Sequence, residues 1–159
     1  MRRWIPLLMI LAGLAALGTY FGPDLYRGLL FRRDCAALLE ATAAGDLSQV
    51  AAQLTPTQQS GIGALITDTV PAGYEEYIES LRMTRWWRVD KTTIWAIVTV
   101  RLGNGDGLSI YQGKLRWIYD PAARRWWWDF NGSYGAPLAS SGEPVWQRLG
   151  DLIQLTEQL

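Results

Sequence analysis

The spacing of apolar residues in this chain changes from a helical repeat to a strand repeat near residue 74. Before this point, apolar side chains recur every three to four residues, as on one face of a helix. Between residues 74 and 131 they alternate with polar ones, as in strands buried on one face. Helices followed by a run of antiparallel strands predict an α+β fold, with helices packed on a four-stranded antiparallel sheet.

Local signals divide the helical part into three short helices. Asp34 is expected to cap the first helix and Gly45 to end it. Asp46, with Gln49 three residues later, predicts the start of the second helix. Pro56 marks the first position of the third. We expect the apolar faces of these helices to pack on the sheet through Cys35, Leu38, Leu39, Leu47, Val50, Leu54, Ile62, Leu65 and Ile66.

Four strands are predicted in the second part. In the first strand, the alternation places Trp87 on the buried face with Leu81 and Met83, and Trp86 on the other face. In the last strand, Trp126 and Trp128 point inward and Trp127 outward. A loop is expected at 103–107, an irregular stretch at 132–143, and a final helix from Pro144 that carries Val145, Trp146, Leu149, Leu152 and Ile153.

The N-terminal segment predicts a single membrane-spanning helix. Arg2 and Arg3 precede eighteen residues without a charge, 4–21. At about 1.5 Å per residue these form about 27 Å of helix, close to the thickness of a hydrocarbon core. Gly22-Pro23-Asp24 is expected to end this helix. The predicted domains are an anchor at 1–26 and an α+β domain at 27–159; a cleaved signal peptide is the alternative.

The flanks of the anchor predict its orientation and its contacts. A short basic N-terminus favours a C-terminal domain in the periplasm, anchored in the cytoplasmic membrane. Small residues at Ala12, Gly13 and Ala16 would let a neighbouring membrane helix approach closely. The expected surroundings of this segment are therefore the lipid bilayer and other membrane helices.

Composition removes many functions. The chain has no His, so Ser-His-Asp and Cys-His catalysis and the commonest zinc ligand are excluded. Fifteen basic residues balance fifteen acidic ones, which argues against a nucleic-acid partner. The single Cys35 lies on an apolar helix face and is interpreted as a small buried hydrophobe. We therefore expect no catalytic residue, metal or cofactor.

The tryptophans are the most prominent candidate for function. Eight of the nine lie beyond the predicted anchor, and arginines stand near several of them. Exposed Trp beside Arg is typical of protein interfaces. The outward positions predict a protein interface that includes Trp86, Arg88, Arg125 and Trp127.

The run AALLEATAAGDLSQVAAQLTP resembles the opening helices of nuclear transport factor 2-like domains. An anchor followed by such a domain also resembles membrane-anchored assembly components of type IV secretion systems. The resemblance implies helices over the concave face of a curved sheet. We expect a non-catalytic accessory, assembly or stabilising subunit of a larger bacterial membrane complex, such as secretion, respiratory or photosynthetic machinery. The alternatives are a cone that binds a small apolar ligand, with isomerase-like chemistry, and a free-standing anchored domain that binds a molecule of the cell envelope.

Overall fold

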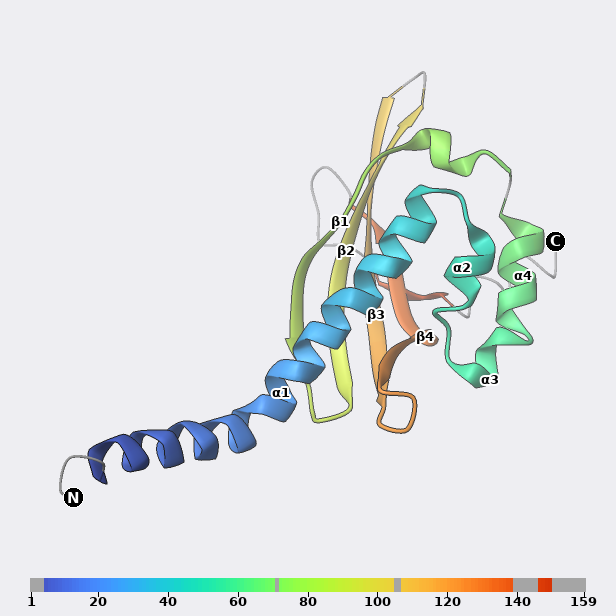
Figure 1. Ribbon diagram of the computed structural model, residues 1–159. Coiled ribbons are helices and arrows are strands. Elements are labelled where there is room, and N and C mark those ends of the chain that lie inside the picture. The colour runs from blue at the N-terminus through green and yellow to red at the C-terminus, as the bar shows by residue number, and fades with distance from the viewer. Residues whose placement is uncertain (1–4, 71, 105–106, 139–145, 150–159) are drawn as a thin grey trace.

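A computed structural model describes residues 5–70, 72–104, 107–138 and 146–149 of the chain. The fold is α+β, with helices gathered on one side of an antiparallel sheet (Figure 1). Its elements are α1 (Ile5–Ala43), α2 (Leu47–Ala51), α3 (Pro56–Gln59), α4 (Ile62–Thr69), the short 3-10 helix η1 (Tyr74–Tyr77), β1 (Ile78–Arg88), β2 (Thr93–Asn104), β3 (Gly107–Asp120), β4 (Arg125–Pro137) and β5 (Gln147–Arg148).

The sheet contains five strands in the order β1-β2-β3-β4-β5, and neighbouring strands are antiparallel. The four predicted strands are confirmed. The prediction of an irregular stretch from residue 132 is wrong up to Pro137, because this backbone pairs with β3 and β5. Gln147 and Arg148, which the sequence predicted to be helical, form β5 instead, and Pro144 and Val145 lie outside the described residues. Leu152 and Ile153 lie outside the described residues.

Helix α1 is one continuous helix, and the predicted break at Gly22-Pro23-Asp24 is wrong. Pro23 lies inside it. A proline within a helix removes one backbone hydrogen bond and its ring crowds the preceding turn, which bends a helix without always ending it. In Figure 1 the first part of α1 projects away from the sheet, and the second part runs across it. The predicted anchor and the α+β domain therefore share one helix.

The prediction that Asp34 caps a helix is wrong. Asp34 is a buried residue inside α1. Its carboxylate accepts a hydrogen bond of 2.7 Å from the backbone N–H of Trp126 on β4. Its other oxygen is paired with the guanidinium of Arg33 at 2.7 Å. Asp34 therefore joins the helix to the sheet.

The predicted boundary between the first two helices is confirmed. Gly45 adopts φ = 71°, which costs glycine little, and its N–H donates to the carbonyl of Thr42. The Asp46 N–H donates to the carbonyl of Ala41, which completes a Schellman end of α1. The Asp46 side chain then accepts from the N–H of Gln49 and caps α2. The Asp46 carboxylate also accepts from the Ser48 hydroxyl at 2.7 Å. The hydrogen bonds from Ser48 and, to a smaller extent, from Gln49 lower the pKa of Asp46.

The third predicted helix is divided into α3 and α4. Pro56 begins α3 as expected, and the helix stops before Gly61. A Cβ atom at Gly63 of α4 would lie 3.3 Å from the Cβ of Ala51 on α2. Gly63, which weakens this helix locally, therefore also allows α4 to approach α2 closely.

A β-bulge in β1 changes which tryptophan faces the helices. Met83 pairs with Val98 but Arg85 pairs with Ile97, so Thr84 is an extra residue. Beyond the bulge the alternation shifts by one position. Trp86 therefore packs toward α1, and the predicted inward position of Trp87 is wrong.

The core lies between α1 and the sheet. The ring of Phe31, which is fully buried, has its centroid 5.2 Å from that of Trp86, 5.7 Å from Trp117 and 6.1 Å from Trp126. Trp126 also donates its indole N–H to the carbonyl of Arg27 at 2.9 Å. The inward positions predicted for Trp126 and Trp128 are confirmed.

Within the described part of the chain, no helix combines the length and the mean hydropathy of a membrane span. The predicted anchor at 1–26 therefore receives no support from this criterion.

We predict that Asp34→Ala lowers the free energy of unfolding by about 1.5–3 kcal/mol, because it removes a hydrogen bond to a charged acceptor and leaves the buried N–H of Trp126 without a partner. Urea denaturation of the full chain measures this. Asp68→Ala removes an exposed carboxylate from α4 and is the matched control, expected within about 0.5 kcal/mol of the parent chain. Equal stability of the two variants would contradict the role of Asp34.

Candidate docking surface

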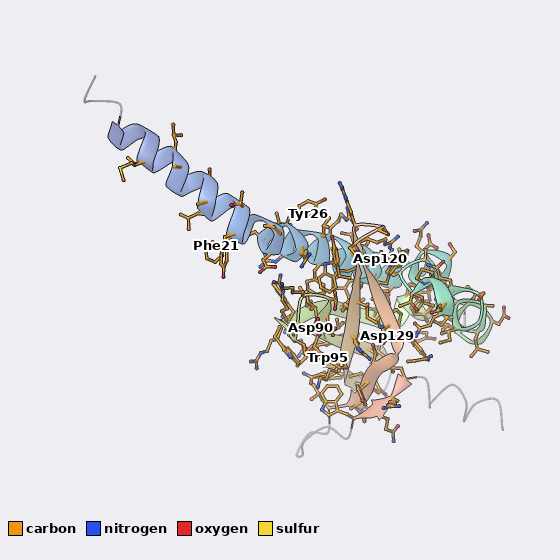
Figure 2. All side chains as sticks on the ribbon, turned by 90° about the horizontal axis from the view of Figure 1, so that it is seen from below. Phe21, Tyr26, Asp90, Trp95, Asp120 and Asp129 are labelled. Atoms are coloured by element: carbon orange, nitrogen blue, oxygen red, sulfur yellow. The ribbon has the colours of Figure 1, made fainter. Side chains whose placement is uncertain are left out.

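The helices cover one face of the sheet, and within the described ranges no helix lies over the other face (Figure 1). Figure 2 shows Trp95 on the side of the sheet away from α1. The strand register places Trp87 beside Trp95 and Trp95 beside Arg116. The next row crosses all four long strands as Arg85, Ile97, Lys114 and Tyr134. We call these two rows, together with Arg82 and Arg101 on the same face, the open face.

Aromatic rings surround one ammonium group on the open face. The Nζ atom of Lys114 lies 4.7 Å from the ring centroid of Trp95 and 5.6 Å from that of Trp87. Trp95 and Tyr134 have their centroids 6.0 Å apart, and Arg85 lies over Trp87 at 5.8 Å. Trp87, Trp95 and Tyr134 are each half-buried. Such amphipathic rings present apolar area that a partner can cover.

Charge is separated between the two sides of the molecule. The open face carries five basic residues, Arg82, Arg85, Arg101, Lys114 and Arg116. Residues 34–81, which include α2, α3 and α4, contain seven acidic residues and no basic one. The chain is neutral as a whole, but the open face is basic, and residues 34–81, most of which lie on the helical side, carry only acidic charges. The open face is therefore complementary to an acidic surface.

Trp127 and Arg125, two residues of the predicted interface, lie together on β4. The guanidinium carbon of Arg125 is 3.8 Å from the ring centroid of Trp127, and Arg125 donates to the side-chain oxygen of Gln53 at 2.8 Å. Burial lowers the pKa of Arg125 from its ordinary value. Trp127 pairs with Ile118 and so belongs to the same side of the sheet as the open face.

Trp86 and Arg88, the other two residues of the predicted interface, lie on the side that faces α1. Trp86 contacts Phe31, and Arg88 forms an ion pair of 2.9 Å with Asp24 on α1. The expectation that Trp86 and Trp127 share a face is wrong, because the bulge at Thr84 turns Trp86 toward the helix. Whether any of the four contacts a partner stays a prediction.

Sequence reasoning missed Trp87, Trp95, Lys114 and Tyr134 as members of one surface. Trp95 could have been found, because it stands between the apolar residues Ile94 and Ala96, both buried, and the alternation of a strand then points it outward. The outward position of Trp87 could not have been predicted, because no residue near Thr84 is typical of a β-bulge. Lys114 and Tyr134 join the cluster only through the pairing of β3 with β2 and β4.

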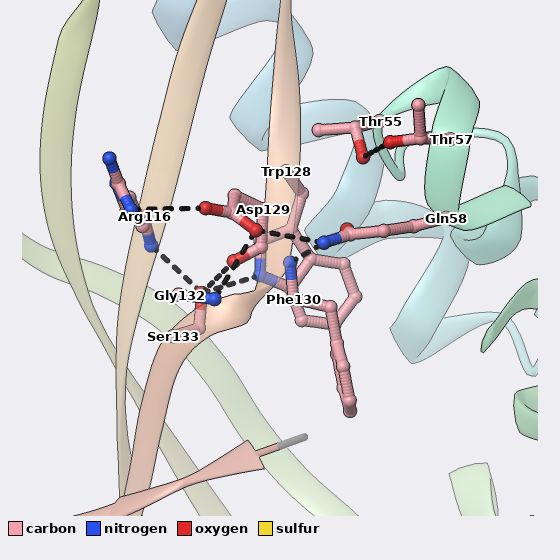
Figure 3. Close-up of polar contacts among 9 residues, drawn as sticks. All are labelled: Thr55, Thr57, Gln58, Arg116, Trp128, Asp129, Phe130, Gly132 and Ser133. Atoms are coloured by element: carbon pink, nitrogen blue, oxygen red, sulfur yellow. Dashed lines mark hydrogen bonds and ion pairs between the residues drawn. The ribbon is translucent and has the colours of Figure 1, made fainter.

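A polar network supports the irregular part of β4 (Figure 3). The Asp129 carboxylate accepts from the side-chain amide of Gln58 at 2.8 Å and from the N–H of Gly132 at 3.2 Å, and it is paired with Arg116 at 3.4 Å. The hydroxyl of Ser133 donates to the Asp129 carbonyl at 2.6 Å and accepts from the N–H of Arg116. Asp129 therefore stabilises a bulge and attaches α3 to the sheet.

The backbone of residues 53–55 covers the edge of β4 beside this network. The N–H of Thr55 donates to the carbonyl of Trp128, and the N–H of Trp128 donates to the carbonyl of Gln53. Leu54 forms a parallel bridge with Trp128. These hydrogen bonds occupy the backbone N–H and carbonyl of Trp128, which could otherwise pair with another strand.

Two other kinds of site are possible in such a fold: a metal site and a ligand cavity under α1. Among the described residues, no group of three or more His, Cys, Asp or Glu is arranged to hold a metal ion. The space between α1 and the sheet, where a cone would hold a ligand, contains the fully buried rings of Phe31, Trp117 and Trp126.

The projecting part of α1 exposes large apolar side chains. Met9 is 71% exposed, Tyr20 77% and Leu25 69%. Ile10, Leu11, Leu17 and Phe21 are each more than half exposed as well. Ala12, Gly13 and Ala16 are exposed on the same part, and a Cβ atom at Gly13 would meet no atom within 4 Å. The prediction that they pack against a membrane helix is untested.

No family model, curated protein or solved structure matches this chain. The resemblance to nuclear transport factor 2-like domains therefore stays a prediction.

Cys35 is only 1% exposed, and its sulfur lies 3.7 Å from that of Met83. Burial first, and then the neighbouring Asp34, raise the pKa of its thiol to about 12. Because the thiolate is the reactive form, we predict that iodoacetamide alkylates Cys35 in the folded chain on the order of a thousandfold more slowly than a free thiol. Labelling should become fast after unfolding in urea, as mass spectrometry would show. Rapid labelling of the folded chain would contradict the buried position.

Proposed function

We propose that this protein is a non-catalytic, membrane-anchored accessory subunit of a larger bacterial membrane complex. The observation that carries the proposal is the projecting part of α1, which leaves large apolar side chains exposed over residues 9–26. Large contiguous apolar surfaces on soluble monomers are rare and mark contacts with a membrane or another protein. The region that precedes Gly22 is also free of charge back to Trp4.

This support comes from exposure and charge, since the criterion of length and mean hydropathy identifies no span among the described helices. Trp4 at one end of the uncharged stretch and Tyr20 at the other suit the two interfaces of a bilayer. In the proposed arrangement the N-terminus stays in the cytoplasm and the α+β head lies in the periplasm. Ala12, Gly13 and Ala16 would face a helix of the complex.

The head supplies the second contact of the proposed subunit. Its open face would dock on an acidic surface of a neighbouring subunit, with the cations selecting the partner and the rings of Trp87, Trp95 and Tyr134 covering apolar area. Helix α1 is continuous from the projecting part into the core of the head. This continuity would hold the docking face at a defined position relative to the bilayer.

We predict that the full chain stays in the membrane fraction after alkaline carbonate washing and is released by detergent. Leu11→Arg places a charge near the centre of the uncharged stretch 4–21, which costs about 3 kcal/mol at the centre of a span, and should release the chain. Leu108→Arg makes the same change at an exposed leucine of β3 and should leave the chain in the membrane fraction. Release of the parent chain by carbonate would contradict the anchor.

The orientation is checked with a reporter that is active only in the periplasm, fused after Leu159. Activity is expected. Activity of only a cytoplasmic reporter at the same position would reverse the proposed topology.

We predict that Lys114→Glu and Trp95→Ala each weaken copurification of the partner subunits, with a loss of about 2 kcal/mol or more, about thirtyfold in affinity, if either residue is central to the interface. Arg124→Glu, in the turn before β4, and Tyr77→Ala, an exposed ring outside the sheet, are the matched controls. Gentle detergent extraction followed by quantitative mass spectrometry gives the partner yield. Equal yields from the test and control variants would contradict docking through the open face.

A further inference from the structure

A depression lies where the projecting part of α1 meets the sheet, with a volume of about 380 Å³. Its walls are the face of α1 from Asp24 to Arg32 and two side chains of β1, Trp86 and Arg88. We call it the neck pocket. Leu25 and Leu29, which are 69% and 65% exposed, form its apolar side.

The neck pocket has a positive charge that is not neutralised within it. Arg88 is held by Asp24, through an ion pair of 2.9 Å and a hydrogen bond of 3.0 Å to the Asp24 carbonyl. Arg32 lies 6.0 Å from the ring centroid of Trp86, and no carboxylate in the described part of the chain forms an ion pair with it. Two guanidinium groups and one carboxylate leave the site attractive to an anion. Guanidinium groups match phosphate oxygens in geometry as well as charge.

The position of the pocket along α1 suits a lipid headgroup. Asp24 comes three residues after the uncharged stretch ends at Phe21, which is about 4.5 Å further along the helix. Side chains on a helix lean toward its N-terminus, so Arg32 reaches back by about one turn, toward the level of Leu29 and Gly28. The polar layer of a bilayer extends about 5–8 Å beyond the hydrocarbon core, and Asp24 would lie within it.

We propose that the neck pocket binds the headgroup phosphate of an anionic phospholipid, with Arg32 and Arg88 as phosphate ligands and Leu25 and Leu29 beside the first carbons of an acyl chain. This inference rests on the proposed membrane anchor. The leucines beside the two arginines distinguish a lipid from free phosphate, which would gain nothing from apolar walls. Arg27, whose guanidinium donates to the backbone carbonyl of Lys91 at 3.5 Å, and Lys91 itself add positive charge near the same end of the sheet.

Gly28 keeps the pocket open. A Cβ atom at this position would lie 4.0 Å from the ring of Trp86, an ordinary contact. Gly28→Ala is therefore tolerated, whereas the longer side chain of Gly28→Leu would extend into the pocket without changing its charge. This substitution separates the shape of the site from the general attraction of basic residues to anionic lipid.

The full chain in dodecyl maltoside is mixed with phosphatidylglycerol, phosphatidylcholine or inorganic phosphate, and the retained molecules are counted by native mass spectrometry. We expect one phosphatidylglycerol to be retained, at least tenfold in preference to phosphatidylcholine. Removing one basic contact should reduce retention about fivefold, and the combined change Arg32→Gln with Arg88→Gln should abolish the preference. Gly28→Leu should do the same, with an unchanged melting temperature.

Arg82→Gln with Arg101→Gln removes the same charge from the open face and is the control, expected to retain the lipid as the parent chain does. No preference for phosphatidylglycerol, or an equal loss in the control, would overturn the inference. Retention of inorganic phosphate as strong as that of the lipid would overturn the lipid assignment. Carbonate washing separates this failure from that of the proposed function: a chain that stays in the membrane but shows no lipid preference contradicts the neck pocket alone.

Discussion

The attachment of α1 to the sheet is the constraint on which the rest of the structure depends. Phe31 inserts its ring among Trp86, Trp117 and Trp126, so one helical side chain unites three strands. Asp34, one turn further along, accepts the backbone N–H of Trp126. Burial of large rings supplies the apolar area, and the buried hydrogen bond fixes the position of the helix, because an unsatisfied N–H or carboxylate there would be costly.

This attachment explains why the two sides of the sheet differ. Once α1 and the shorter helices cover one side, the alternating side chains of the strands must meet water or a partner on the other. The chain places Arg, Lys, Trp and Tyr there, which tolerate water and also suit an interface. Residues 34–81, which include the three short helices, carry seven acidic residues and no basic one. The neutral chain therefore separates a basic open face from an acidic segment on the other side.

The same helix joins the head to the projecting apolar part, and the neck pocket lies at their junction. Because α1 does not end at Pro23, there is no linker between the two parts. Contacts at the neck, such as the ion pair between Arg88 and Asp24, therefore bear on how the head is held relative to the projecting part. Under the proposed function, an anionic lipid at this point would fix that position further.

The sequence by itself determined the features of the fold that depend on residues close together in the chain. It predicted the division into helices and antiparallel strands, the end of a helix at Gly45, the cap at Asp46, and the inward positions of Trp126 and Trp128. These follow from φ preferences, hydrogen bonds within a few residues and the twofold repeat of a strand. Only the tertiary structure decided the path of α1 through Pro23, the burial of Asp34 against Trp126, 92 residues away, and the bulge at Thr84. Each of these depends on packing and hydrogen bonding with a distant segment, which outweigh the local preference for a helix break, a cap or a regular strand. The membership of the open face also depends on tertiary structure. Trp87 belongs to it only because the pairing of β1 with β2 leaves Thr84 unpaired, which shifts the alternation by one residue.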